Sequence, residues 1–165
     1  TKIDQLQDLD LVWHFVGPIQ SNKSRAIAAH FDWVHSVDRL KIARRLSEQR
    51  PADKSPLKVC LQVNISAEDS KSGVDLQQLS ALAREVAALP RLELRGLMAI
   101  PALTDDVAQQ RQAFAALRQA LESLRDVAPD MDTLSMGMSG DLESAIAEGS
   151  TIVRVGTAIF GPRQR

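Results

Sequence analysis

The sequence contains no tyrosine, only one cysteine and few aromatic residues, which make up 4% of its 165 residues. The lone Cys60 lies in the apolar run Val59-Cys60-Leu61, and a single cysteine excludes an intrachain disulfide framework. This cysteine usage is typical of a reducing compartment, so we expect the protein to be cytoplasmic. We also expect no signal peptide, and the sequence has no apolar run long enough to span a bilayer, which argues against a membrane protein.

Neither sign of charge is in excess, because 20 Lys and Arg residues stand against 21 Asp and Glu residues, for a formal net charge of −1. A strongly basic chain would predict a nucleic-acid or anionic-membrane partner, and this balance predicts neither. The length suits a single domain over residues 1–165, with roughly two-thirds of the unfolded surface available for burial on folding.

Short β-rich runs alternate with amphipathic helical stretches along the chain. Six runs are predicted as strands: Trp13–Ile19, Trp33–Val37, Lys58–Ile65, Glu93–Ile100, Thr133–Met136 and Thr151–Val155. Several are mostly apolar, as expected of strands covered on both faces. Three helical stripes lie between them: Leu76, Leu79, Leu82, Val86 and Leu89; Phe114, Leu117, Leu121 and Leu124; and Leu40, Ala43 and Leu46. A strand followed by a helix, repeated, predicts parallel βαβ units with right-handed crossovers.

Two α/β folds satisfy this alternation, a doubly wound open sheet and a (β/α)8 barrel. No Gly-x-Gly-x-x-Gly follows the first strand, which disfavours a dinucleotide-binding fold. Six strands are too few for an ordinary barrel, whose functional face is built from the loops after each strand. A barrel therefore requires two strands that this sequence does not contain.

The stretches after the last two predicted strands are suited to binding an anion. Ser139 is predicted as the N-cap of a helix whose first N–H groups favour a phosphate, although for this stretch alone an ordinary serine cap is the better-supported alternative. Gly156 and Thr157 follow the final strand, where backbone amides and a hydroxyl can approach an anion closely. Phosphate sites of (β/α)8 barrels commonly lie after the last two strands, so the two signals reinforce each other.

The remaining candidate residues are less specific. Arg154 either pairs with a buried carboxylate or faces a ligand at the barrel mouth. His14 could point inward from the first strand, although a lone histidine there is more often a core residue, and Asn64 would lie on the functional face. His30 and His35 lie across a predicted helix-to-strand junction and do not predict a metal site. No Ser–His–Asp or Cys–His arrangement indicates nucleophilic catalysis.

Four stretches resemble signatures of the YggS/PROSC family of pyridoxal 5′-phosphate (PLP) homeostasis proteins. They are Trp13 to Lys23, Leu94 to Pro101, Leu134 to Ser139 and Gly149 to Gly161. The resemblance implies a (β/α)8 TIM barrel of the alanine racemase N-terminal type, of which this sequence holds the third to eighth strands. In the family, the lysine that forms the Schiff base with PLP ends the first strand. The sequence is therefore expected to be N-terminally truncated and to carry no catalytic residue.

The resemblance also implies a set of PLP-binding residues. Ser139, Gly156 and Thr157 would bind the phosphate, and Arg154 would lie beside the pyridine nitrogen, while Asn64 and His14 would line the pocket. The implied function is that of a PLP carrier or regulator without established catalysis, with PLP-dependent apo-enzymes as recipients.

Two alternatives remain open. One is a PLP-dependent, racemase-like enzyme acting on an amino acid. Such enzymes typically take a second catalytic base, a tyrosine, from another domain, and this sequence has no tyrosine. The other is a barrel enzyme acting on a phosphorylated metabolite through the same anion site.

Two of the six lysines, Lys23 and Lys71, fall in loops after predicted strands, on the cofactor face. Exposed lysines are mostly protonated near neutral pH, which makes them poor Schiff-base anchors, and Lys71 is predicted to be solvated rather than reactive. This chain by itself is expected to bind PLP weakly, mainly through the phosphate.

Overall fold

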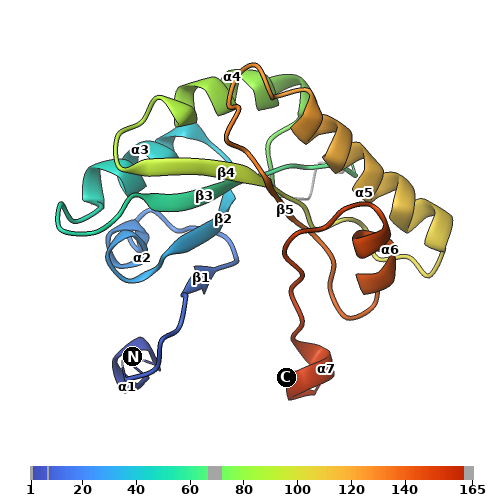
Figure 1. Cartoon of the computed structure of the whole chain (residues 1–165), viewed down its shortest axis with the longest axis horizontal. Helices are drawn as coiled ribbons and strands as arrows, with labels where there is room; N and C mark the ends of the chain where they lie inside the picture. The colour runs from blue at the N-terminus through green and yellow to red at the C-terminus, as the bar shows by residue number, and fades with distance from the viewer. Residues whose placement is uncertain (1, 7, 67–71, 162–165) are drawn as a thin grey trace.

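The computed structural model describes residues 2–6, 8–66 and 72–161. Its single sheet has five parallel strands in chain order: β1 (His14–Phe15), β2 (Trp33–Val37), β3 (Leu57–Gln62), β4 (Leu92–Met98) and β5 (Thr133–Ser135). The helices are α1 (Lys2–Gln5), α2 (Ser24–His30), α3 (Leu40–Gln49), α4 (Leu76–Ala87), α5 (Val107–Glu122), α6 (Leu142–Ala147) and α7 (Thr157–Phe160). Figure 1 shows the sheet arching beneath α3, α4 and α5, with α1 and α7 on the open side of the arch.

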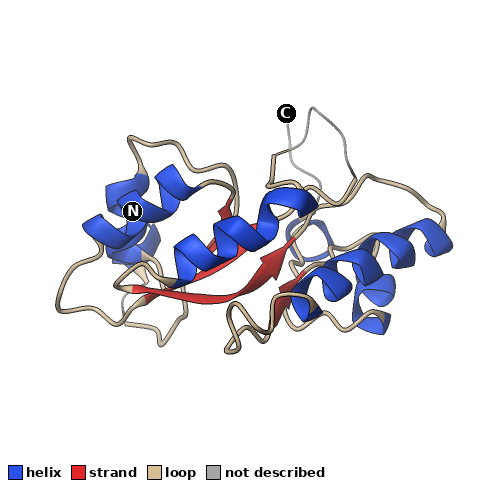
Figure 2. Ribbon diagram, turned by 90° about the horizontal axis from the view of Figure 1, so that it is seen from above, coloured by secondary structure: helices blue, strands red, loops and turns tan. Residues whose placement is uncertain are grey.

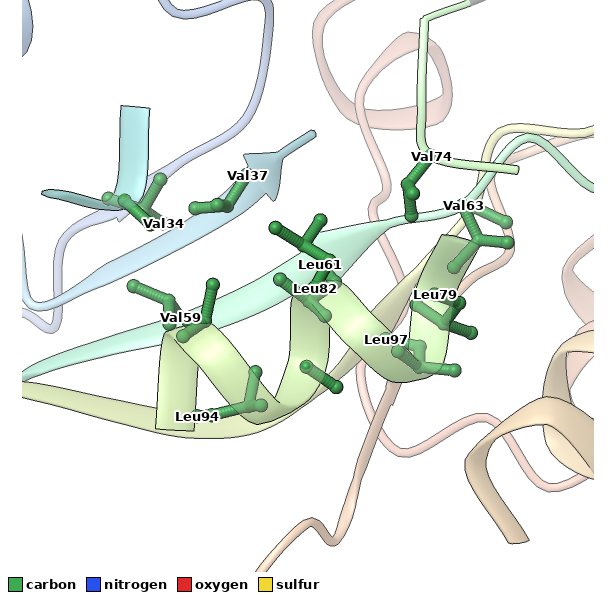
Figure 3. Close-up of a cluster of buried hydrophobic side chains, with 14 of the residues drawn as sticks. Val34, Val37, Val59, Leu61, Val63, Val74, Leu79, Leu82, Leu94 and Leu97 are labelled. Carbon is green, nitrogen blue, oxygen red and sulfur yellow. The ribbon is translucent and has the colours of Figure 1, made fainter. Parts of the chain in front are cut away.

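The main core lies between the sheet and its covering helices. Val59 and Leu61 of β3 and Leu97 of β4 pack with Leu79 and Leu82 of α4 (Figure 3). Viewed from above, the strands form one twisted layer with α4 crossing over it (Figure 2). Within the described residues, no helix is both long and apolar enough to cross a membrane.

The three predicted helical stripes correspond to α3, α4 and α5. In α4, the stripe is buried at Leu79, Leu82 and Val86, as predicted. Leu76, the first residue of the helix and of the stripe, is instead 48% exposed. In α5, Phe114 is fully buried, as predicted.

The first predicted strand is shorter than the sequence indicates, and the last is reduced to an isolated bridge. Trp13–Ile19 reduces to β1 because Gly17 adopts φ +140°, and Pro18 has no N–H to donate to a ladder. Thr151–Val155 forms no strand and makes one isolated bridge, between Ile152 and Ser135. Met136 donates its N–H to the Ile152 carbonyl at 3.1 Å, but the next N–H along, that of Arg154, donates to the Gly137 carbonyl at 2.9 Å instead of to Met136, so the regular parallel ladder does not continue.

Alternation along the strands gives the sheet a second, inner face. Cys60 lies between Val59 and Leu61, which pack toward α4, so its side chain points to the opposite side. Cys60 and the neighbouring Met98 are fully buried, but they do not belong to the core between the sheet and its covering helices. Two of the candidate site residues, His14 and Arg154, make side-chain hydrogen bonds across this inner face.

Candidate functional site

The two segments predicted to hold an anion lie side by side. The Ser139 hydroxyl accepts a hydrogen bond from the Ala158 backbone N–H over 3.4 Å. Ala158 is in the first turn of α7, which has Gly156 as its N-cap and Thr157 as its first residue. Ser139, Gly156 and Thr157 are all exposed, and a Cβ added at Gly156 would meet no atom within 4 Å. Hydroxyls and backbone amides from both segments are therefore accessible at one place, which we call the Ser139–Thr157 cradle.

Ser139 does not cap the helix that follows it, so its predicted role as an N-cap is wrong. The N-cap of α6 is Asp141, whose carboxylate accepts a hydrogen bond from the Met138 N–H at 2.6 Å. Gly137 turns the chain here with φ +94°, and a Cβ at that position would lie 2.6 Å from the Ala145 Cβ. Because Asp141 occupies the capping position, the Ser139 hydroxyl is left to face α7.

Arg154 points across the inner face of the sheet. Its Nη1 donates to the Ser135 hydroxyl at 2.8 Å, and its Nη2 donates to the Ala99 carbonyl at 2.9 Å. Among the described residues no carboxylate forms an ion pair with Arg154, so a neutral hydroxyl and a carbonyl hold it. Burial lowers the pKa of Arg154 while Asp141 raises it, and a guanidinium remains cationic under such shifts.

A chain of side-chain hydrogen bonds continues from Ser135 to the other edge of the sheet. The Ser135 Oγ lies 2.7 Å from His35 Nδ1, and His35 Nε2 lies 2.8 Å from His14 Nδ1. His14 also stacks on Trp33, with ring centroids 5.4 Å apart and planes 6° from parallel. The chain thus connects Arg154 to β5, β2 and β1.

Sequence reasoning missed His35, because it weighed this histidine only as a metal ligand beside His30. A usable signal was present in the two neighbouring strands. The Cα register pairs His14 with Trp33, and residues two apart on a strand share a face, so His14 and His35 lie on the same side. Among the described residues, no three His, Cys, Asp or Glu side chains are grouped to hold a metal ion.

Burial determines the protonation of this inner face. Burial, followed by His14 and Arg154, lowers the pKa of His35 to about 4. Burial also lowers the pKa of His14, although Asp32 opposes the shift. The pKa of the Cys60 thiol is raised to about 12, mainly by burial. Near neutral pH both imidazoles and the thiol are therefore uncharged. In the hydrogen-bond chain from Arg154 to His14, the positive charge is on Arg154.

The other predicted residues lie elsewhere or make other contacts. Asn64 follows β3, is half-buried, and donates its backbone N–H to the Val74 carbonyl at 3.0 Å. Lys23 lines an apolar groove of about 600 Å³ between α1, β1 and α2. Lys71 lies outside the described residues.

Comparison with known proteins places this arrangement in a family. The sequence profile of the family described as "Alanine racemase, N-terminal domain" matches residues 7–164. The pyridoxal phosphate homeostasis protein of Pseudomonas aeruginosa is 65% identical to the chain over 159 residues, which cover 96% of this chain and 68% of that protein. The chain belongs to the pyridoxal phosphate homeostasis protein family. The family resemblance identified from the sequence is thus confirmed.

Two solved structures establish the fold of this homeostasis-family chain. PipY of Synechococcus elongatus PCC7942, solved with PLP bound, matches with a TM-score of 0.87 and 40% identity, over 97% of this chain and 76% of that one. Alanine racemase from Corynebacterium glutamicum matches with a TM-score of 0.71 and 21% identity, over 98% of this chain and 46% of that one, a likeness that shows the fold alone. The predicted barrel of the alanine racemase N-terminal type is confirmed, and the five parallel strands form part of its wall.

Proposed function

We propose that this chain binds PLP and acts in PLP homeostasis as a carrier or regulator. A relative 65% identical to it is named for that role, and PipY was solved with PLP bound. The observation that carries the proposal is the contact between the Ser139 hydroxyl and the Ala158 N–H, which joins the last two loops into one cradle. Arg154 lies two residues before Gly156 and is held on the inner face beside this cradle.

The residues present in the cradle fit a phosphate. Phosphate oxygens accept hydrogen bonds from hydroxyls and from backbone N–H groups. The cradle offers both kinds of donor, in the hydroxyls of Ser139 and Thr157 and in the backbone N–H groups of the α7 turn. The Ala158 N–H is 3.4 Å from the Ser139 oxygen, which is long for such a bond, so a phosphate oxygen would be a better acceptor. Gly156 leaves open space for the group. We also propose that Asn64 and His14 line the same pocket, as the family resemblance implies.

Arg154 is suited to holding the PLP ring rather than to catalysis. Bound PLP supplies an aldehyde and an electron-withdrawing ring. A permanent cation beside the pyridine nitrogen disfavours protonation of that nitrogen, and an unprotonated ring is a weaker electron sink. A carrier in the cytoplasm that delivers PLP to PLP-dependent apo-enzymes needs such unreactive binding. Amino-acid turnover by the PLP-loaded protein well above that of free PLP would contradict this part of the proposal.

Removing the cradle hydroxyls is expected to weaken PLP binding through the phosphate. Ser139→Ala and Thr157→Val should each raise the Kd for PLP by about tenfold, because each removes a hydrogen bond to a charged group. Equilibrium dialysis at pH 7.5 measures the Kd. Pyridoxal, which lacks the phosphate, serves as the comparison ligand, and its Kd should not change.

Ser80→Ala is the matched control, because Ser80 is exposed on α4 and makes no contact with the cradle among the described hydrogen bonds. It should leave the Kd for PLP unchanged. If the two cradle variants weakened pyridoxal as much as PLP, the phosphate assignment would be wrong.

A further inference from the structure

The hydrogen-bond chain from Arg154 to His14 has a direction that follows from its donors and acceptors. The Arg154 guanidinium can only donate, so the Ser135 oxygen accepts from it at 2.8 Å. The described contacts of the Ser135 hydroxyl offer one acceptor for its proton, His35 Nδ1 at 2.7 Å. His35 must then carry its proton on Nε2, where it donates to His14 Nδ1 at 2.8 Å. Each hydrogen bond in the chain then has one donor and one acceptor while both imidazoles are neutral.

This direction strengthens the hold on Arg154. A hydroxyl that donates its own proton becomes a better acceptor, because the bonds in a chain polarise one another. The Ser135 oxygen therefore binds the guanidinium most firmly while its proton points to His35. The position of Arg154 thus depends on which nitrogen of the buried His35 is free to accept.

We propose that His35 is a positioning residue for Arg154 and that the protonation state of His14 sets the tautomer of His35. Proton uptake at His14 then changes the direction in which the Ser135 hydroxyl points its proton. This inference rests on the proposed function, in which Arg154 lies beside the PLP ring. When His14 takes up a proton, both of its nitrogens become donors, and His35 Nε2 must become an acceptor. His35 then carries its proton on Nδ1 and donates it to Ser135.

Protonation of His14 adds one proton to the His14–His35 pair, and no proton leaves the pair. His35 stays neutral, exchanging its proton on Nε2 for one on Nδ1, and Ser135 keeps its proton, which turns away from His35. The Ser135 oxygen then accepts from both His35 and Arg154, so its bond to the guanidinium weakens. Arg154 is therefore held firmly when His14 is neutral and loosely when His14 is charged.

The charges around the two imidazoles favour His14 as the entry point for the proton. His14 is exposed, whereas His35 is 1% exposed. Burial lowers the pKa of His14; the Asp32 carboxylate beside β1 opposes this shift, and Lys58, whose Nζ lies 5.4 Å from the centre of the Trp33 ring, adds to it. Arg154 disfavours a charge on His35. The pair therefore takes up its proton at His14.

Nitrogen NMR of the full chain labelled with ¹⁵N-histidine tests the tautomers without any ligand. At pH 7.5, His35 should show a protonated Nε2 and an unprotonated Nδ1. As His14 titrates, this pattern should invert. Exposed His30, which has no place in the chain of contacts, is the internal control and should show no such inversion. Protonation of His35 at Nδ1 at pH 7.5, or an unchanged pattern once His14 is charged, would overturn the proposal.

His14→Gln removes the titrating imidazole at an exposed position, and circular dichroism verifies that the variant is folded. Over the pH range in which wild-type His35 inverts, His35 in this variant should keep its proton on Nε2, because the titrating group has been removed. Inversion of His35 in the absence of the His14 imidazole would equally refute the coupling.

The link to the PLP site is tested with two substitutions of His35. His35→Asn retains an amide oxygen that can accept the Ser135 proton, so its Kd for PLP should stay within about twofold of the wild type. His35→Leu removes that acceptor and should raise the Kd about fivefold. Equal effects of the two variants, with circular dichroism showing both folded, would exclude the positioning role. If the wild type itself failed to bind PLP, the proposed function would fall, while the NMR result would still decide the tautomer coupling.

Discussion

Replacing Gly96 with alanine is expected to destabilise the protein by about 3 kcal/mol or more, the largest effect of any substitution considered for this chain. A Cβ at Gly96 would lie 1.8 Å from the Thr133 carbonyl oxygen and 2.8 Å from the Thr133 Cβ. Neither the oxygen nor its backbone can move aside, because Gly96 pairs with Thr133 in the ladder between β4 and β5. Urea unfolding at pH 7.5, followed by circular dichroism, measures the loss.

Gly140→Ala is the control for this prediction. A Cβ at Gly140 would meet no atom within 4 Å, so the change in unfolding free energy should stay within about 0.5 kcal/mol. Comparable losses from the two substitutions would contradict a steric origin. The same ladder pairs Met98 with Ser135, which holds Arg154, so any folded fraction of the Gly96→Ala protein should also bind PLP more weakly.

Acidification from pH 7 to pH 4 is expected to remove about 3 kcal/mol of stability through His35 alone. Burial lowers the pKa of His35 to about 4 in the folded protein, while its ordinary value in the unfolded chain is 6.5. Between these values the unfolded chain binds more protons than the folded one, so the free energy of unfolding falls as the pH falls. Above pH 7 neither state is protonated, and the penalty vanishes.

Urea unfolding of the wild type and of His35→Asn at pH 7, 5.5 and 4 isolates this contribution. Hydrogen bonds from Arg111 and Arg118 lower the pKa of Glu148, which adds an acid-dependent loss common to both proteins. The difference between the two profiles should therefore grow from about pH 6.5 down to pH 4. Parallel profiles would show that His35 is not held neutral by the fold.

The parts of the fold that depend on local pattern could be predicted from the sequence. The run Trp33–Val37 was predicted with the bounds that β2 has, because it is uninterrupted by glycine or proline. The first strand was overestimated because the predicted run continued through Gly17 and Pro18, which end the ladder. The sixth run, Thr151–Val155, has strand-like residues, but its Arg154 N–H donates to the Gly137 carbonyl, out of register with the ladder, and strand propensity does not predict such a shift.

One feature of the candidate site could likewise be predicted from the sequence, and another could not. That Ser139 and Thr157 would meet could be argued from topology, because the loops after neighbouring parallel strands emerge at the same edge of a sheet. That Asp141, not Ser139, is the N-cap of α6 could not be predicted, since both residue types are suited to that position. The assignment of these residues to PLP stays a prediction for the binding experiments.

The sequence by itself determined the α/β fold class and the family, and it predicted a phosphate site in the loops that carry Ser139 and Thr157, because each depends on residues close together in the chain. The tertiary structure alone decided that His14, His35, Ser135 and Arg154 form one chain of hydrogen bonds. His35 and Ser135 are 100 residues apart in sequence, and their side chains meet because the curved sheet brings β2 and β5 together across its inner face. Strand register and sheet curvature set that meeting, and both arise from packing across the whole domain.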